Sequence, residues 1–211
     1  MRKLILILLI TGFGLHVKAQ HAGYAPLTDL AKFKQQFAAV AQKTETIKSD
    51  FVQEKALSML EEKIVSKGKF WFKKTNLLRM EYNKPFQFLM ILNKDNVYIK
   101  DGQKENKIST RSSKIFKQIN KIVIECIQGT ALSNPDFKTA VFENKNTYLV
   151  ELSPVAKGLK EFFKTINITI DKKDYSVTTI KMLENSDDTT TLHFSNKELN
   201  VSIPDALFAI K

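Results

Sequence analysis

The sequence predicts an α+β fold that is mainly β, a curved antiparallel sheet of about eleven strands with helices covering its concave face. Strand-like runs follow one another from Thr46 to Ser195 and are separated by turn-forming residues, which is typical of a meander. The runs between Gly68 and Asn93 carry large apolar side chains on both faces, so either a cover or a ligand cavity must lie against the second face. A helical pattern over Ser113–Gln128 interrupts the strands and can supply a cover.

The first nineteen residues have the pattern of a secretory signal peptide. Arg2 and Lys3 precede the apolar run Leu4–Ile10, and Val17-Lys18-Ala19 places small residues at the −3 and −1 positions of a cleavage site. The run is shorter than the ~20 apolar residues that cross a bilayer, which disfavours a retained membrane anchor. We therefore expect cleavage of residues 1–19 and a soluble exported chain, residues 20–211, that forms a single domain.

The composition narrows the classes of partner. The chain has a formal net charge of +11, and removing Arg2, Lys3 and Lys18 leaves 11 − 3 = +8. Its lysines are scattered, as on a solvated surface, and export makes nucleic acid the least expected partner. The one cysteine, Cys126, excludes an intramolecular disulfide, so buried apolar surface must supply the stability.

The expected elements begin with a loose tail, Gln20–Pro26. Thr28 or Asp29 can then cap a helix that runs to about Ala41, because Leu30, Phe33, Phe37 and Val40 recur at helical spacing. The expected strands are Thr46–Gln53, Glu62–Lys73, Leu77–Tyr82, Phe86–Asn93, Asn96–Lys100, Glu105–Ser109, Lys138–Glu143, Thr147–Leu152, Thr165–Asp171, Ser176–Leu183 and Thr189–Ser195.

Two further helical segments are expected, one after the sixth strand and one after the eighth. Ser113–Gln128 has a wide apolar stripe and a stop at Gly129, and Val155–Phe163 is a second, shorter piece. The longer segment is expected to fold back across the concave face. Helices on a curved sheet can complete an ordinary core or close a ligand cavity, and the periodicity is compatible with both.

Several short motifs resemble those of a known family in their order and spacing. They are Phe51-x-Gln53, Gly68-x-Phe70-Trp71-Phe72-Lys73-Lys74-Thr75-Asn76-Leu77, Arg79-x-x-Tyr82-x-x-Pro85, Pro154-x-x-Lys157-Gly158-Leu159-Lys160-x-Phe162 and Leu207-Phe208. The chain resembles the periplasmic outer-membrane lipoprotein carrier family, LolA. The resemblance implies a strongly curved, incomplete antiparallel barrel closed by helices. It also implies a monomeric periplasmic protein that carries acylated lipoproteins from an inner-membrane ABC-type transporter to an outer-membrane acceptor.

A lipid carrier needs an apolar, adaptable cavity and a cover that can move. One sixteen-carbon acyl chain exposed to water costs roughly 12 kcal/mol. Aromatic and unbranched side chains suit the lining, and the residues expected there are Phe51, Phe70, Phe72, Leu78, Met80, Phe88 and Met90. The residues expected on a hinged lid helix are Ile115, Phe116, Ile119, Ile122, Val123 and Ile127. Which face of each strand lines the cavity stays open at this point.

The chain departs from the family pattern at the turn after the aromatic strand. Family members commonly have arginine and proline there, and that arginine is implicated in holding the lid closed. Here the residues are Lys74-Thr75. Lysine keeps the charge but lacks the planar group that makes several fixed hydrogen bonds, so Lys74 is expected to be a looser lid latch, acting at the end of the lid helix.

An enzyme is the least favoured function. After processing, the histidines are His21 in the tail and His193 on a strand, too few for a metal site or a histidine-based triad. Cys126 is interpreted as an apolar lid residue and not as a nucleophile. We expect no catalytic residue, metal or cofactor. A carrier is favoured over a module of the same fold that senses envelope lipid or lipoprotein, and both over an enzyme acting on lipids or glycans.

Overall fold

The computed structural model describes residues 21–74, 76–94, 96–102, 104–109 and 122–210. The predicted signal peptide and residues 113–121 of the predicted lid helix lie outside them. The described strands are β1 (Ala25–Pro26), β2 (Thr46–Ala56), β3 (Lys63–Lys73), β4 (Leu77–Lys84), β5 (Phe88–Asn93), β6 (Asn96–Asp101), β7 (Lys104–Ser109), β8 (Phe137–Glu143), β9 (Thr147–Pro154), β10 (Phe163–Asp171), β11 (Val177–Glu184) and β12 (Thr189–Leu199).

These strands form one antiparallel sheet in the order β1-β8-β9-β10-β11-β12-β2-β3-β4-β5-β6-β7. The strands at its two ends, β1 and β7, do not pair with each other, so the sheet is an open, incomplete barrel. This confirms the predicted fold class. All eleven predicted strands are confirmed too, with ends that differ by a few residues.

Two segments differ from the prediction. The expected tail, Gln20–Pro26, contains β1, in which Ala25 pairs with Glu143 of β8. The expected helix over Val155–Phe163 is only α3 (Lys157–Lys160). It is short because Val155 donates its backbone N–H to Asp136 at 2.8 Å and Phe163 already begins β10. In both segments, residues at one end join a strand of the sheet.

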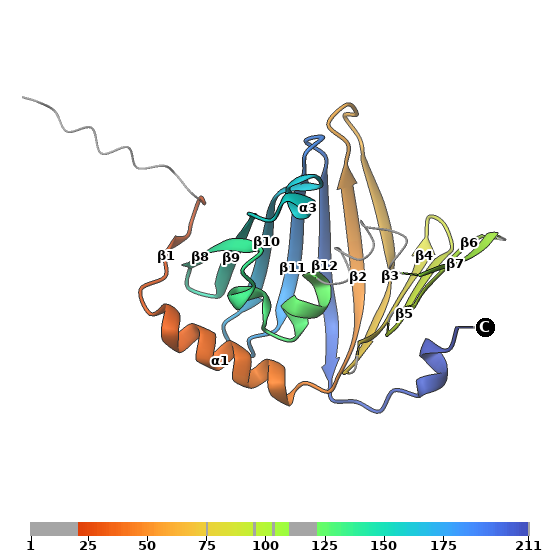
Figure 1. Cartoon of the computed structure of the whole chain (residues 1–211), viewed down its shortest axis with the longest axis horizontal. Helices are drawn as coiled ribbons and strands as arrows, with labels where there is room; N and C mark the ends of the chain where they lie inside the picture. The colour runs from red at the N-terminus through yellow and green to blue at the C-terminus, as the bar shows by residue number, and fades with distance from the viewer. Residues whose placement is uncertain (1–20, 75, 95, 103, 110–121, 211) are drawn as a thin grey trace, which may run out of the picture.

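The sheet topology requires a long connection between β7 and β8. β7 lies at one end of the strand order and β8 lies beside the other end, so the chain between them has to connect the two ends. Its described part contains a helix, residues 122–127, which we call the lid helix, and a 3-10 turn, Ala131–Ser133. Figure 1 shows this helix, in green, in front of the central strands, and α1 (Leu30–Lys43), in orange, along the lower ends of β8 to β12.

α1 begins as the sequence predicts. The Asp29 carboxylate caps it by accepting a hydrogen bond from the Lys32 backbone N–H at 2.9 Å. Phe33 and Phe37, four residues apart, are almost fully buried against the sheet. The helix ends at Lys43, two residues beyond the predicted end. α1 is thus an amphipathic helix laid on the concave face.

Strands β3 to β6 bury apolar side chains on both faces, and a different part of the chain packs on each face. On the concave face Phe70, Phe72, Met80 and Met90 join the main core beneath α1 and the lid helix. The opposite face carries the alternate residues, and these pack with the C-terminal segment, residues 201–210, which includes the 3-10 helix η2 (Asp205–Phe208). The residues of this second core are Trp71, Leu77, Leu89, Ile91, Tyr98, Val201, Ile203, Leu207, Phe208 and Ile210.

The C-terminal cover is the part that sequence analysis did not identify. Phe208 is completely buried, and Figure 1 shows η2 beside the ends of β4 and β5. Arg79 donates a hydrogen bond to the Leu207 carbonyl at 3.1 Å, and Asn93 donates one to the Phe208 carbonyl at 3.0 Å. The doubly apolar strands therefore need two covers, of which the lid helix is only one.

Candidate lipid-binding site

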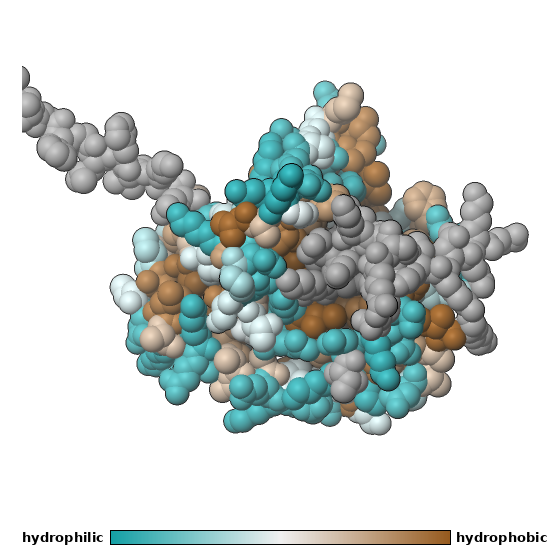
Figure 2. All heavy atoms as spheres, in the orientation of Figure 1, coloured by the Kyte–Doolittle hydropathy of each residue, from teal (hydrophilic) through white to brown (hydrophobic). Residues whose placement is uncertain are grey.

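An apolar cavity lies between α1, the lid helix and strands β2, β3, β11 and β12. Its volume is about 60 Å³. The apolar side chains that line it are Phe37, Val40, Ala41, Ile47, Phe70, Val123, Cys126, Ile127, Val177, Ile180, Phe194 and Leu199. Figure 2 shows hydrophobic residues in the middle of this face, framed by hydrophilic ones. The sheet supplies the floor of the cavity, and the two helices supply its walls and cover.

This cavity is too small for a long acyl chain as it stands. A cavity of ~150 Å³ lined by apolar side chains accepts a benzene molecule, and the present one has less than half that volume. A ligand with a long chain can enter only if a covering element moves. The cavity as the described residues form it is therefore smaller than the site that a long acyl chain needs.

The predicted lining residues all belong to the concave side. Phe70 lines the cavity itself. Phe51, Phe72, Leu78, Met80 and Met90 are buried in the core that continues from it, and Phe88 is partly buried against that core. Their contact with a ligand stays a prediction. The lining from α1, β11 and β12 was not predicted, although the helical spacing of Phe37 and Val40 and the position of Ile180 in an alternating strand are signals in the sequence.

The described lid helix presents its predicted stripe to the site. Ile122 and Val123 are buried, and Val123 and Ile127 line the cavity. The other predicted lid residues, Ile115, Phe116 and Ile119, lie outside the described part of the chain. Cys126 is 1% exposed and also lines the cavity. Its burial, with a smaller contribution from Glu125, raises the pKa of the thiol well above its usual range, so Cys126 behaves as a small apolar residue.

Gly129 ends the lid helix and brings it close to α1. The Thr130 N–H donates to the Glu125 carbonyl at 2.9 Å, and Gly129 itself has φ = +71°, as in a Schellman motif. A Cβ atom at this position would lie 3.0 Å from the Cβ of Ala41. Glycine is required here both for its backbone conformation and for the close approach of the two helices.

Lys74 does not contact the end of the lid helix, as was predicted, but the end of α1. Its ammonium donates to the Gln42 carbonyl at 2.8 Å and to the Glu45 carboxylate at 2.7 Å, so it sits at the end of α1 and not at the end of the lid helix. The reason is proximity, because the Lys74 backbone N–H also bonds the Glu45 carbonyl at 2.8 Å. An effect on the lid would have to pass through α1, against which Gly129 packs, and a latch role stays a prediction.

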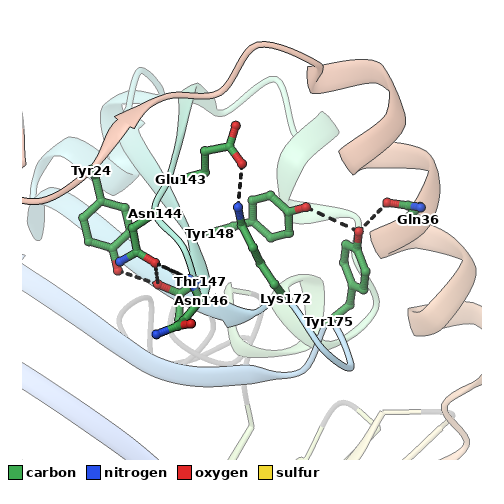
Figure 3. Close-up of polar contacts among 9 residues, drawn as sticks. All are labelled: Tyr24, Gln36, Glu143, Asn144, Asn146, Thr147, Tyr148, Lys172 and Tyr175. Atoms are coloured by element: carbon green, nitrogen blue, oxygen red, sulfur yellow. Dashed lines mark hydrogen bonds and ion pairs between the residues drawn. The ribbon is translucent and has the colours of Figure 1, made fainter.

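Polar contacts also fix α1 to the sheet at the turn between β10 and β11 (Figure 3). The Tyr175 hydroxyl donates a hydrogen bond to the Gln36 side chain of α1 and lies 3.4 Å from the Tyr148 hydroxyl. Lys172 forms an ion pair with Glu143 at 2.6 Å and lies over the Tyr148 ring. α1 is thus tied to the sheet at its middle as well as at its end. The lid helix, which packs chiefly through apolar side chains, is the better candidate for the moving cover.

The histidines do not form a reactive group with one another. His21 contacts Glu151 at 3.1 Å, whereas His193 faces Thr179 on the exposed side of β11 and β12. Among the described residues, no group of three or more histidine, cysteine or acidic side chains could hold a metal ion. Within the same part of the chain, no helix is long and apolar enough to cross a membrane.

Several solved structures are similar to this chain over most of its length. A LolA superfamily protein from Nitrosomonas europaea matches with 10% identity and a TM-score of 0.46, covering 84% of this chain and 97% of that one. MucB matches with 9% identity and a TM-score of 0.50, covering 89% of this chain and 65% of that one. The lipoprotein LppX from Mycobacterium tuberculosis matches with 9% identity and a TM-score of 0.43, over 82% and 96% of the two chains. A comparison with curated proteins found no match.

The family comparison covers most of the chain. Residues 42–211 match the model of the outer membrane lipoprotein carrier protein LolA. The match begins at the end of α1 and includes the lid helix and the C-terminal cover. The open antiparallel sheet, closed by helices on its concave face, is the architecture that the resemblance implied. The chain therefore belongs to the LolA family of outer membrane lipoprotein carrier proteins.

Proposed function

We propose that this protein is a periplasmic carrier that encloses the acyl chains of lipoproteins, or of another acylated lipid, during transfer from the inner to the outer membrane. Members of the LolA family are periplasmic binding and carrier proteins. The observation that most supports the proposal is the apolar cavity beneath a cover that packs through apolar side chains. The described part of this cover faces the cavity with Val123, Cys126 and Ile127, whose contacts an acyl chain can replace.

Exchange of like contacts is the physical basis of loading and release. Val123, Cys126 and Ile127 line the same apolar cavity as Phe70 and pack in the same core. An entering acyl chain replaces these contacts with others of the same apolar kind, so the free energies of the two states lie close together. The carrier can then give up its cargo to an acceptor that binds the chain better, with no chemical step in the protein.

A transfer assay tests this proposal. The protein is purified from its native envelope, co-purified acylated molecules are identified by mass spectrometry, and their transfer to acceptor membranes is measured. We expect acylated cargo that binds stoichiometrically and leaves on contact with the acceptor. Cargo that is bound and never handed on would favour a sensing module of the same fold. The absence of any acyl binding would overturn the proposal.

A matched pair of variants assigns the binding face. Phe70 lines the cavity, whereas its neighbour Trp71 points to the other face of the same strand. In folded Phe70→Glu protein, a carboxylate in the cavity loses its water without gaining a partner, so affinity for a fluorescent acyl chain should fall at least tenfold. Trp71→Glu introduces the same charge on the opposite face and should leave the affinity near that of the wild type.

A further inference from the structure

One corner of the cavity is polar, and the side chains there come from β2, β12 and the turn before β11. Ser49 of β2 is 3% exposed and lines the cavity, and its hydroxyl has no hydrogen-bond partner among the described residues. A buried hydroxyl without a partner is destabilising. Its retention in an otherwise apolar cavity points to a ligand that supplies the missing partner.

A break in strand pairing places a lysine at the same cavity. β12 pairs with β2 in regular register until Ser195, opposite Asp50, and resumes at Glu198, opposite Lys48. Asn196 and Lys197 therefore stand opposite Ser49 alone, and Asn196 has φ = +50°. A bulge of this kind redirects side chains. Its effect here is that Lys197, which is partly buried, lines the apolar cavity.

The surroundings of Lys197 leave its ammonium only partly neutralised. It donates hydrogen bonds to the Ser176 hydroxyl and to the Val177 carbonyl. The nearby carboxylate of Asp174 accepts hydrogen bonds from the Ser176 hydroxyl at 2.6 Å and backbone N–H at 2.8 Å. Burial acts to raise the pKa of Asp174, but the Ser176 hydrogen bonds and the Lys197 charge outweigh it, so this pKa is lowered. Asp174 is thus occupied by the turn, and Lys197 can bind a further anion.

We propose that this corner binds the polar end of an anionic acyl lipid, with the Lys197 ammonium pairing with a carboxylate or phosphate and the Ser49 hydroxyl donating to an oxygen at the start of the acyl chain. The chain itself occupies the apolar part of the cavity beneath Val123 and Ile127. The inference rests on the proposed function, because it specifies the class of ligand for the same cavity. It makes the cavity selective for charge as well as for apolar surface.

The test compares a fluorescent hexadecanoic acid with its methyl ester, which has the same chain and no charge. Wild-type protein should bind the acid about tenfold more tightly, as expected for one charge-assisted contact. Lys197→Met should abolish this preference and keep the affinity for the ester. Lys48→Met is the matched control: Lys48 lies next to Ser49 on β2 and pairs with Glu198 at 2.7 Å away from the cavity, so the preference should persist. Displacement by monoacylglycerol phosphate, compared with monoacylglycerol, separates phosphate from carboxylate recognition.

Ser49→Ala gives a second, independent readout. Removing the unpartnered hydroxyl should leave the melting temperature unchanged or higher, while the affinity for both ligands falls about fivefold. A hydroxyl with a structural hydrogen bond would lower the melting temperature instead. Equal affinity for acid and ester in the wild type, or a preference for the acid that survives Lys197→Met, overturns the inference. If the protein still binds the ester in that case, the proposed carrier function stands. Failure to bind either ligand overturns both.

Discussion

The two covers of strands β3 to β6 differ in how they are held. The C-terminal cover combines the fully buried Phe208 with hydrogen bonds from Arg79 and Asn93 to its backbone carbonyls. The lid helix instead packs its apolar stripe over a cavity. Its side-chain hydrogen bonds lie outside that stripe, from Asn134 to the Glu125 carboxylate at 2.6 Å and from Gln128, just after the helix, to Asn76 at 3.2 Å. Directional bonds fix one position, whereas apolar contact can be exchanged for an acyl chain. Under the proposed function, the face beneath the C-terminal cover stays closed and the concave face opens.

The largest expected effect is on the face that stays closed. Phe208→Ala removes a completely buried ring and should lower the free energy of unfolding by about 3–5 kcal/mol in urea denaturation. The affinity of the folded variant for an acyl ligand should not change, because Phe208 packs on the face opposite the cavity. A loss of ligand affinity at full folding would mean that the two faces are not independent.

An intermediate effect is expected at the end of the lid helix. Gly129→Ala places a Cβ atom 3.0 Å from Ala41 in a residue with positive φ, which costs about 1–2 kcal/mol. If this cost falls on the closed lid, Cys126 should react with a thiol reagent about tenfold faster. Burial raises the Cys126 pKa, so the closed state holds almost no thiolate. The reaction should therefore proceed from the open state, where the thiol pKa returns toward ~8.5. Because the thiolate is the reactive form, the labelling rate should rise with pH.

Gly102→Ala provides the matched control for that measurement. Gly102 also has positive φ, at +57°, and sits in the turn after β6, remote in the sheet order from β11 and β12. Among the described residues, no atom lies within 4 Å of its Cβ position. The backbone cost should be similar, without the clash with Ala41. Equal acceleration of Cys126 labelling in both variants would show that the reaction follows global destabilisation and not lid opening.

The smallest effect is expected from Lys74→Leu. The lysine is 42% exposed and its ion pair with Glu45 is solvated, so the loss in unfolding free energy should stay below ~1 kcal/mol. Because Lys74 contacts the end of α1, its influence on the lid passes through the contact between Ala41 and Gly129. Cys126 labelling should therefore rise no more than about threefold. A rise as large as that of Gly129→Ala would make Lys74 a principal latch after all.

The sequence was sufficient for the sheet but not for the way its two faces are covered. Alternating runs and turn residues predict strands well because strand pairing and local pattern agree, and the Gly129 stop is equally local. The C-terminal cover was missed because residues 201–210 form little regular structure and are held by contacts with Arg79 and Asn93, more than a hundred positions away.

The polar features of the site were missed for a related reason. Lys74 was assigned by its resemblance to a family position, whereas its partner is decided by the neighbouring end of α1. Lys197 and Ser49 meet at the same cavity through an irregularity in strand pairing, and nothing in the local pattern of β12 indicates a bulge. Tertiary pairing therefore decides which polar side chains reach the apolar cavity.

Contacts between the ligand and the protein's methyl groups test the central claim most directly. The protein is deuterated, with protonated methyl groups on its methionine and isoleucine residues, and nuclear Overhauser effects from a bound acyl chain are measured. The account predicts effects at Ile180, Ile122 and Met90 on the concave face, and none at Ile91 or Ile203 beneath the C-terminal cover. Overhauser effects at Ile91 and Ile203 would contradict binding on the concave face. So would a bound ligand that gives no effect at any of these five residues.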